Sequence, residues 1–538
     1  MNENKDLCLS DLITKGASLY PDNTMLISED GFERYTYRRF HHICNRLAKS
    51  FIKMGVKKGD RIGIWIPKSP ECIMLQFAAA RIGAVIVPMN AHEKLTAINN
   101  ILEQIEINVL ILSEGVYGSE NIDILRQISP DLKFNKTLPH LKHIVLMGHQ
   151  AVENTISWHD FLELAEGAND HTLKKREQEN HPDDVIHIIL TSGTAGKPKG
   201  VMLSHTNMIV NASEIARRMN ISDADIFCLQ TPLFHTFGCV TGVILPILCG
   251  CSIVVMRSTK PSDILTRVQA EKCSVLSGVP TMFIRLIEEY KQGSYDISSL
   301  RTGVVAGDFS PPALIESIVN DMNMQDVITS YGMTETSPAV TATFYNDSLR
   351  DKKETVGSPL PNVEVKMVDD SGKEVQCGEI CVRGYNIMKG YYKMPLETKK
   401  AIDDQGWLYT GDFGSFDPES NYLKIECRLK DIIIKSGENI SPGEVELMIM
   451  QNPKVKRVCV IGVPDRIKGQ AVMAFIQLKQ GCFITADDLN AFLKGKIATN
   501  KIPKYYKFVR EFPIASTGKI NKLYLKESIF NENERMIL

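Results

Sequence analysis

The sequence has no apolar run long enough to cross a bilayer and no segment typical of a secretory signal. Its most apolar stretch, VTGVILPILCGCSIVVM (240–256), contains Gly and Pro and falls short of the roughly 20 residues that a membrane-spanning helix needs. The first residues, MNENKDLCLSDL, lack both a basic start and an apolar segment. We therefore expect a cytoplasmic protein without a transmembrane segment.

A strong excess of charge of either sign is also missing. The chain carries 62 Lys and Arg against 64 Asp and Glu, for a net charge of −2. Proteins that bind nucleic acid usually show a basic excess or a basic stripe, so we expect no nucleic-acid partner. With 538 residues, of which 43% are hydrophobic, the chain is too long for one ordinary domain.

Cysteine patterns that bind metal ions are absent from the sequence. Its 13 cysteines include no CxxC pair, and no Cys pair is followed by a His pair at zinc-finger spacing. The odd count and the long chain indicate reduced thiols that are mostly buried.

Hydrophobic periodicity predicts an α/β fold. Apolar runs such as RIGIWI (61–66), AVIVPM (84–89) and NVLILS (108–113) alternate with helical stretches such as IMLQFAAARIG (73–83). Strands that alternate with helices form parallel sheets with helices on their faces. The polar segment from about 150 to 180 is typical of an exposed linker.

The sequence changes character near Arg428. A turn-rich β region precedes it, and about 110 residues with their own strands and helices follow, which is a common size for a small domain. Ser441, Pro442 and Glu444 fit the N-cap, N1 and N3 positions of a helix. We expect a capping box there, which gives Glu444 a structural role.

A glycine-rich loop, LTSGTAGKPKG (190–200), follows the apolar run VIHIIL. It is not a Walker A loop, because Gly193 and Gly196 are only three positions apart and Pro198 follows Lys197. It is not a dinucleotide fingerprint either, since no G-x-G-x-x-G follows this strand. Its backbone N–H groups, its hydroxyls and Lys199 suit an anion, although these residues alone leave a plain surface loop open.

Five motifs follow one another along the chain: LTSGTAGKPKG, SYGMTET (330–336), YTGD (409–412), RLKDIIIKSGENISPGEVE (428–446) and FPIASTGKINK (512–522). In sequence and order they resemble the motifs of the adenylate-forming superfamily, which includes acyl-CoA synthetases, adenylation domains of peptide synthetases, and luciferases. The stretches VVAGDFSPP, VGSPLPNVEVK and KIPKYYKFVREFP look most like medium-chain fatty acyl-CoA synthetases. The resemblance implies a large N-terminal domain (1–429) of two packed α/β subdomains plus a β-rich subdomain, and a small mobile α+β lid domain (430–538).

The resemblance also implies a role for each matching residue in ATP binding. Tyr331 would stack on adenine, Asp412 would accept hydrogen bonds from both ribose hydroxyls, and Arg428 would lie near the ribose or a phosphate. Thr334 would donate to the α-phosphate, and Glu335 would hold Mg²⁺. The implied ATP- and AMP-binding residues are Thr191, Ser192, Gly193, Thr194, Ala195, Gly196, Lys199, Gly307, Asp308, Tyr331, Gly332, Met333, Asp412 and Arg428, and the implied metal-binding residues are Thr194 and Glu335.

The remaining implied roles concern the acid and CoA. Lys519 would bridge the substrate carboxylate and the α-phosphate, and Lys430 would be the hinge about which the small domain rotates. The implied catalytic residues are Lys519, Thr334, Glu335 and His235, the implied CoA tunnel residues are Ser436, Gly437 and Glu438, and the implied acyl-pocket residues are His235, Gly303, Phe309 and Gly332.

Five positions depart from the pattern of the superfamily. Ala195 and Ala515 replace a common Thr, and Cys427 replaces a common Gly. Asp308 and Phe309 stand where small residues or Pro are common. Phe309 would shorten an acyl pocket, and Asp308 would disfavour a plain hydrocarbon if it faced the ligand.

The leading hypothesis is an ATP-dependent acid–CoA ligase that uses Mg²⁺, ATP and CoA and acts on a medium-chain fatty acid. An enzyme that loads a carrier-protein thiol would share every motif, so a carrier protein stays open as a partner. Luciferase-like oxidation is possible on this scaffold, but no residue requires it. A non-catalytic nucleotide or acyl sensor is disfavoured because Glu335, Asp412 and Lys519 are all retained.

Overall fold

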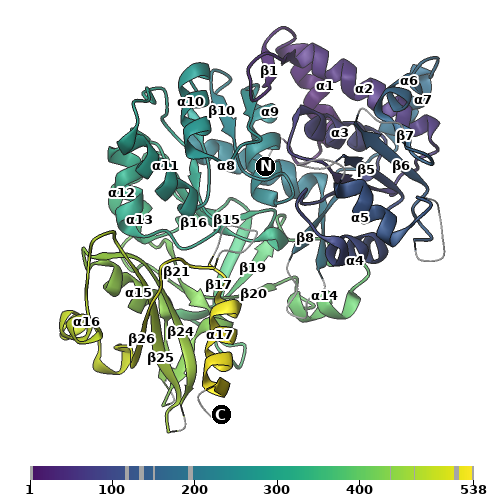
Figure 1. Ribbon diagram of the computed structural model, residues 1–538. Helices are drawn as coiled ribbons and strands as arrows, with labels where there is room; N and C mark the ends of the chain where they lie inside the picture. The colour runs from purple at the N-terminus through teal and green to yellow at the C-terminus, as the bar shows by residue number, and fades with distance from the viewer. Residues whose placement is uncertain are drawn as a thin grey trace.

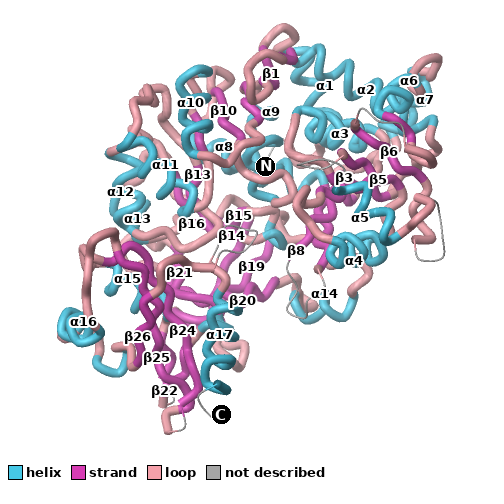
Figure 2. The backbone as a smooth tube through the Cα atoms, in the orientation of Figure 1, coloured by secondary structure: helices cyan, strands magenta, loops and turns pink. Residues whose placement is uncertain are grey.

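The computed structural model describes residues 4–114, 120–132, 138–148, 152–191, 198–436, 438–465, 467–513 and 520–535. Figure 1 shows a large N-terminal part in the upper half of the view and a smaller C-terminal part, coloured green to yellow, below it. Figure 2 shows that strands run through both parts and that helices lie around those of the large part.

A seven-stranded sheet, in the order β7-β6-β5-β3-β4-β8-β9, forms one layer of the large part. Its strands are parallel except for the antiparallel pair β8–β9. Helices cover both faces, so the strands are buried on both sides, as parallel strands usually are. The strands are β3 (Arg61–Trp65), β4 (Val85–Pro88), β5 (Val109–Ser113), β6 (His143–Met147), β7 (Ile156–Ser157), β8 (Val185–Thr191) and β9 (Lys199–Ser204). The helices are α2 (Tyr37–Lys53), α3 (Pro70–Arg81), α4 (Leu95–Ile105), α5 (Glu120–Ile128), α6 (Trp158–Glu163) and α7 (Asp170–Gln178).

A five-stranded sheet, in the order β12-β10-β11-β1-β2, forms a second layer. It is parallel except for the pair β1–β2. One continuous apolar core joins this sheet to the first, which fits the prediction of two packed α/β subdomains. The strands are β1 (Thr24–Ile27), β2 (Arg34–Thr36), β10 (Ile226–Leu229), β11 (Ser252–Val255) and β12 (Val275–Leu276). The helices are α1 (Leu9–Leu19), α8 (His205–Met219), a π-helix (Phe237–Ile244), α9 (Leu245–Cys249), α10 (Pro261–Glu271), α11 (Pro280–Gln292) and α12 (Pro312–Asn320).

Two further sheets complete the large part. The sheet β13-β14-β15-β16 extends the second layer, and an antiparallel sheet, β18-β17-β19-β20-β21, is the predicted β-rich subdomain. The first sheet consists of β13 (Val304–Val305), β14 (Ile328–Gly332), β15 (Ala339–Ala342) and β16 (Ser358–Pro359), with a 3-10 turn (Thr334–Thr336) and α13 (Leu349–Glu354). The second consists of β17 (Val363–Val368), β18 (Glu374–Val375), β19 (Cys377–Gly384), β20 (Leu408–Phe416) and β21 (Leu423–Arg428), with α14 (Pro395–Ala401).

The small part is an α+β unit built on its own sheet, β23-β22-β25-β24, with β26 paired to β25. The predicted boundary between 429 and 430 falls in the 3-10 turn Leu429–Asp431, which separates β21 from β22, and it stays a prediction. The strands are β22 (Ile433–Lys435), β23 (Glu438–Ile440), β24 (Val455–Asp465), β25 (Gly469–Leu478) and β26 (Tyr505–Phe508). The helices are α15 (Pro442–Met450), α16 (Ala486–Leu493), a 3-10 turn (Thr499–Lys501) and α17 (Lys522–Arg535).

The expectation of an exposed linker over 150–180 is wrong. This segment contains β7, α6 and α7, and it leads directly into the first sheet. Each helix is held by one buried apolar side chain, Phe161 on α6 and Leu173 on α7. Phe161 packs against Phe51 with 5.0 Å between the ring centroids, which anchors α6 to α2.

The capping box expected at the start of α15 is also wrong, although the helix does begin with Pro442 after Ser441. The Ser441 hydroxyl donates to the carbonyl of Glu426 at 2.9 Å instead of capping the helix. Glu444 instead accepts hydrogen bonds from Lys501 Nζ at 2.7 and 2.8 Å. Glu444 therefore ties α15 to the 3-10 turn at Lys501.

The described cysteines are free thiols, and most are buried, as expected. No helix in the described ranges is both long enough and apolar enough to cross a membrane.

Candidate active site

A cavity of about 1010 Å³ opens where the strands of the large part end. Thr191 is the last residue of β8, Gly332 is the last residue of β14, and Gln230 follows β10. Ligands of open α/β sheets bind at the carboxyl ends of the strands, so the topology places the cavity where a site is expected. The cavity is lined by several of the residues predicted from the motifs, namely Thr191, Lys199, His235, Gly307, Gly332, Met333, Thr334, Glu335, Arg428 and Lys430.

Tyr331, Asp412 and Arg428 form one polar group beside this cavity. The Tyr331 hydroxyl donates to Asp412 Oδ2 at 2.8 Å, and Arg428 Nε lies 3.5 Å from Asp412 Oδ1. Asp412 and Arg428 face each other in the β20–β21 ladder, which fixes their separation. Burial, and then the charge of Asp412, raises the pKa of Tyr331 well above its usual value, so the phenol remains a donor at neutral pH.

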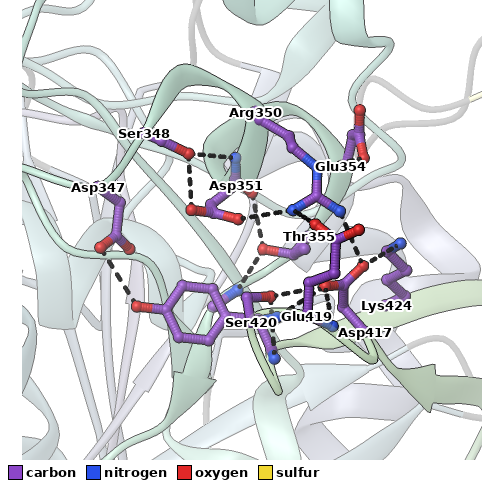
Figure 3. Close-up of polar contacts among 12 residues, drawn as sticks. Asp347, Ser348, Arg350, Asp351, Glu354, Thr355, Asp417, Glu419, Ser420 and Lys424 are labelled. Atoms are coloured by element: carbon purple, nitrogen blue, oxygen red, sulfur yellow. Dashed lines mark hydrogen bonds and ion pairs between the residues drawn. The ribbon is translucent and has the colours of Figure 1, made fainter.

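The β20–β21 hairpin that carries this group is clamped at its turn by the cluster in Figure 3. Asp417, which is almost fully buried, accepts from the backbone N–H groups of Glu419 and Ser420 and pairs with Lys424 and Arg350. The hydrogen bond from Lys424 is the main cause of a pKa of Asp417 well below its ordinary range. Because Arg350 belongs to α13, the cluster fixes the hairpin to the body of the large part.

Glu335 and Thr334 lie on the short 3-10 turn that follows β14. The Glu335 carboxylate is buried, and Oε1 accepts a hydrogen bond from the Tyr391 hydroxyl at 2.8 Å. Lys199 Nζ lies 4.6 Å from the centroid of the Tyr391 ring. The site thus places a carboxylate, a hydroxyl and a mobile cation around one part of the cavity, a set that suits a metal–phosphate complex.

Close backbone packing explains two of the predicted glycines. A Cβ at Gly332 would lie 1.8 Å from the carbonyl oxygen of Pro338, so only glycine allows β14 to approach that segment. Gly303 is similar, because its Cβ would lie 1.9 Å from the carbonyl oxygen of Leu276. Gly332 lines the cavity, whereas Gly303 is buried and does not.

His235 lies at the cavity wall, where its ring packs against Phe234 with 4.5 Å between the centroids. Asp308 and Phe309 are exposed and are not part of the cavity lining, and Asp308 Oδ1 accepts from the N–H of Phe309 at 2.9 Å. Gly307, just before them, lines the cavity with a φ of 90°, a conformation that favours glycine.

Two of the predicted CoA-tunnel residues, Ser436 and Glu438, are not part of the cavity lining. Ser436 and Glu438 flank the turn between β22 and β23, and both are exposed. The N–H of Ser436 donates to the carbonyl of Lys468 at 2.8 Å, and Asn500 Nδ2 donates to the Glu438 carboxylate. Figure 2 shows β22 at the lower end of the small part, away from β8 and β14.

Several predicted residues lie outside the described part of the chain. These are Ser192, Gly193, Thr194, Ala195 and Gly196 of the glycine-rich loop, Gly437 of the tunnel, and the catalytic candidate Lys519, together with the departure at Ala515. Their roles stay predictions.

Sequence reasoning missed two residues that contact the predicted site. Tyr391 hydrogen-bonds Glu335, and Glu379 Oε1 accepts from the N–H of Gly411 at 3.0 Å, next to Asp412. Tyr391 lies in the run GYYKMP, which follows no hydrophobic period. Backbone pairing of the segment 389–392 with β9, far away in the sequence, brings it to the cavity.

Comparisons with known proteins identify the family of the chain. A family model described as AMP-binding enzyme matches residues 13–392, and one described as AMP-binding enzyme C-terminal domain matches residues 444–519. The chain is 40% identical to the putative acyl-CoA synthetase YngI of Bacillus subtilis (strain 168) over 527 residues, which cover 96% of both chains. It is 33% identical to the medium-chain acyl-CoA ligase ACSF2, mitochondrial, of Danio rerio over 537 residues, covering 97% of this chain and 88% of the relative. The crystal structure of ATP-bound MatB from Rhodopseudomonas palustris has a TM-score of 0.84 at 26% identity, covering 96% of this chain and 98% of that chain.

The chain therefore belongs to the AMP-binding enzyme family. Its relatives are named acyl-CoA synthetases and ligases, which confirms the class of enzyme predicted from the five motifs.

Proposed function

We propose that this acyl-CoA synthetase activates a medium-chain fatty acid with Mg²⁺ and ATP and then transfers the acyl group to CoA. The observation that carries the proposal is one cavity whose lining includes the polar residues Lys199, Thr334, Glu335 and Arg428 as well as apolar side chains. Such a cavity suits a substrate with a hydrocarbon chain and a reacting end that must meet a nucleotide.

In the first step, a carboxylate oxygen of the acid forms a bond to the α-phosphorus of ATP. The bond between that phosphorus and the bridging oxygen breaks, and pyrophosphate leaves with the electron pair. Several negative charges meet in this transition state, so aligned donors and cations lower its energy. Thr334 would donate its hydroxyl to the α-phosphate, Lys199 would face the outer phosphates, and Lys519 would bridge the carboxylate and the α-phosphate.

Glu335 fits the role of a Mg²⁺ ligand because its buried carboxylate lines the cavity. Bound Mg²⁺ would neutralise charge on the phosphates. No three His, Cys, Asp or Glu side chains cluster as a metal site within the described ranges. We therefore expect phosphate oxygens, water and the hydroxyl of Thr194 to complete the Mg²⁺ ligands beside Glu335.

The nucleoside would be held by the polar group beside the cavity. Asp412 would accept hydrogen bonds from the ribose hydroxyls, and Arg428 would stay close to the ribose or the α-phosphate. Because the Tyr331 hydroxyl donates to Asp412 Oδ2, it restrains the carboxylate in one orientation. The Tyr331 ring would stack on adenine.

In the second step, the sulfur of CoA forms a bond to the acyl carbon, the bond to the AMP oxygen breaks, and the thiol gives up its proton. The small domain would rotate about Lys430 between the steps, so that the loop of Ser436, Gly437 and Glu438 lines the path of the thiol. Lys430 lines the cavity on the 3-10 turn between β21 and β22, a position that supports a hinge role.

The medium-chain substrate is supported by the cavity and by the relatives. Ile215, Val279 and Met282 are among the apolar residues that line it. ACSF2 of Danio rerio, which matches nearly the whole chain, is named a medium-chain acyl-CoA ligase. A cytoplasmic location remains part of the proposal.

The proposal is tested by ATP–pyrophosphate exchange over a panel of carboxylic acids, followed by mass detection of acyl-CoA. We expect medium-chain fatty acids to support exchange and thioester formation better than acetate or long-chain acids. Lys519→Ala should nearly abolish exchange but still convert a supplied acyl-adenylate to thioester, whereas Lys494→Ala, on an exposed residue of the small domain, should behave like the wild type. If none of the acids in the panel supports ATP–pyrophosphate exchange, the proposal is contradicted. If an acid supports exchange but no acyl-CoA forms, the acceptor is a carrier protein instead of CoA.

A further inference from the structure

Tyr391 contacts two of the residues that the proposed function assigns to ATP and its metal ion. Its hydroxyl donates to Glu335 Oε1 at 2.8 Å, and its ring lies under Lys199 Nζ at 4.6 Å from the centroid. These two partners are 136 positions apart in the sequence, and Tyr391 is the side chain that bridges them.

Backbone pairing holds Tyr391 in this place. The segment 389–392 runs along β9, and three hydrogen bonds join them: Tyr392 N–H to Gly200 O at 2.7 Å, Met202 N–H to Gly390 O at 3.0 Å and Lys389 N–H to Met202 O at 2.9 Å. The N–H of Tyr391 itself donates to the hydroxyl of Thr398, in α14, at 2.9 Å. Figure 1 shows α14 close to β8 at the lower edge of the large part. Tyr391 is 7% exposed, so its orientation is fixed by packing as well as by hydrogen bonds.

The hydroxyl restrains a carboxylate that has no charged partner among the described residues. Within the described ranges, Glu335 makes no ion pair, so the hydrogen bond from Tyr391 is what orients its side chain. A neutral donor does not cancel the carboxylate charge, which remains available to a cation. Burial, and then the charge of Glu335, raises the pKa of Tyr391 far above neutral pH, so the proton stays on the phenol.

The Tyr391 ring restrains the ammonium group of Lys199 without neutralising its charge. In the part of the chain that the structure describes, Lys199 also makes no ion pair, and its Nζ lies over the π-face of Tyr391. An aromatic face attracts an ammonium group without neutralising it. A carboxylate in the same place would form an ion pair and reduce the charge available to a phosphate.

We propose that Tyr391 is a positioning residue that aligns Glu335 through its hydroxyl and Lys199 through its ring for the binding of Mg²⁺ and ATP. The inference rests on the proposed function, because it uses the roles given there to Glu335 and Lys199. It adds a residue that prepares both groups.

The test separates the hydroxyl from the ring. Tyr391→Phe removes only the hydroxyl, Tyr391→Leu removes the aromatic face as well, and Tyr392→Phe is the matched control, because the Tyr392 hydroxyl bonds Glu106 at 3.3 Å instead of a site residue. The dissociation constant for ATP is measured by calorimetry with excess Mg²⁺ and again with EDTA, in the absence of any acid. The ratio of the two constants reports how strongly the metal and the nucleotide assist each other.

We expect Tyr391→Phe to reduce this ratio roughly 10-fold, since a hydrogen bond to a charged group is lost, while ATP affinity in EDTA changes less than about 2-fold. Tyr391→Leu should weaken ATP binding in EDTA as well, by about 3-fold relative to Tyr391→Phe. Tyr392→Phe should match the wild type in both conditions.

Two results would overturn the inference. If Tyr391→Phe has the same ratio of ATP dissociation constants as the wild type, the hydroxyl does not align Glu335. If Tyr391→Phe and Tyr391→Leu bind ATP equally well in EDTA, the ring does not align Lys199. Failure of the proposed function gives a different result: the wild-type protein binds ATP with Mg²⁺ but forms no acyl-CoA with any acid, and the binding constants of the variants still decide the role of Tyr391.

Discussion

Two buried histidines should make the large domain sensitive to mild acid. His187 lies in the middle of β8 and is fully buried, and neither of its ring nitrogens has a partner among the described residues. His205 begins α8, and its Nδ1 accepts from the N–H of Leu9 at 3.0 Å. Burial lowers the pKa of His187 to about 3 and the pKa of His205 to about 4.

The magnitude follows from the difference between the folded and unfolded pKa values. In the unfolded chain each histidine has a pKa near 6.5, so below that pH these histidines are protonated in the unfolded state but stay neutral in the folded state. Stability is therefore fully present above about pH 7.5 and is lost as the pH falls toward the folded pKa values of about 3 and about 4. At pH 5 each histidine costs about 2 kcal/mol of unfolding free energy, so the pair costs about 4 kcal/mol.

The assay is urea unfolding at about pH 8 and about pH 5, compared between the wild type, His187→Leu and His159→Gln. The His159 side chain is 78% exposed and serves as the control. We expect His187→Leu to reduce the loss of unfolding free energy between the two pH values by about 2 kcal/mol, whatever its effect at pH 8. His159→Gln should leave that loss unchanged. An equal loss in His187→Leu and in the wild type would refute the reasoning.

Three further substitutions test the site. Tyr331→Phe removes the donor to Asp412 and should weaken ATP binding roughly 10-fold in calorimetry, and unchanged binding would contradict the orienting role of the hydroxyl. Gly332→Ala places a Cβ 1.8 Å from Pro338 O and should lower the unfolding free energy by about 3 kcal/mol or more, so wild-type stability would show that the backbone can yield. Asp417→Asn keeps a hydrogen-bond acceptor but removes the charge that pairs with Arg350 and Lys424, so both Tm and ATP affinity should fall. A lower Tm with unchanged ATP affinity would show that the Asp417 cluster does not support the ATP site.

The sequence predicted the parallel sheets well because their strands are apolar on both faces. The runs at 61–66, 84–89 and 108–113 match β3, β4 and β5, whose alternate side chains enter two different cores. The same reasoning failed over 150–180. There, Phe161 and Leu173 are the single buried residues of two short helices, and one buried residue per helix produces no periodic signal.

The candidate site was predictable where a motif is continuous in the sequence. The cavity collects Thr334 and Glu335 from one motif and Arg428 and Lys430 from another, and each motif is local. Tyr391 was not predictable, because its contact with Glu335 depends on the pairing of 389–392 with β9.

The helix start at Ser441 shows the opposite error. A local rule assigned Glu444 to a capping box, but Lys501, 57 positions further along the chain, provides a charged partner that the local rule does not consider.

The central claim, that the acid is activated as an acyl-adenylate, is tested most directly by following a carboxylate oxygen. The wild-type protein is given a medium-chain fatty acid labelled with ¹⁸O in both carboxylate oxygens, together with ATP, Mg²⁺ and CoA, and the products are analysed by mass spectrometry. Because a carboxylate oxygen attacks the α-phosphorus and leaves with AMP, the account predicts AMP that carries one labelled oxygen, unlabelled pyrophosphate, and an acyl-CoA that keeps the other label. Unlabelled AMP, or label recovered in inorganic phosphate together with ADP, would contradict it.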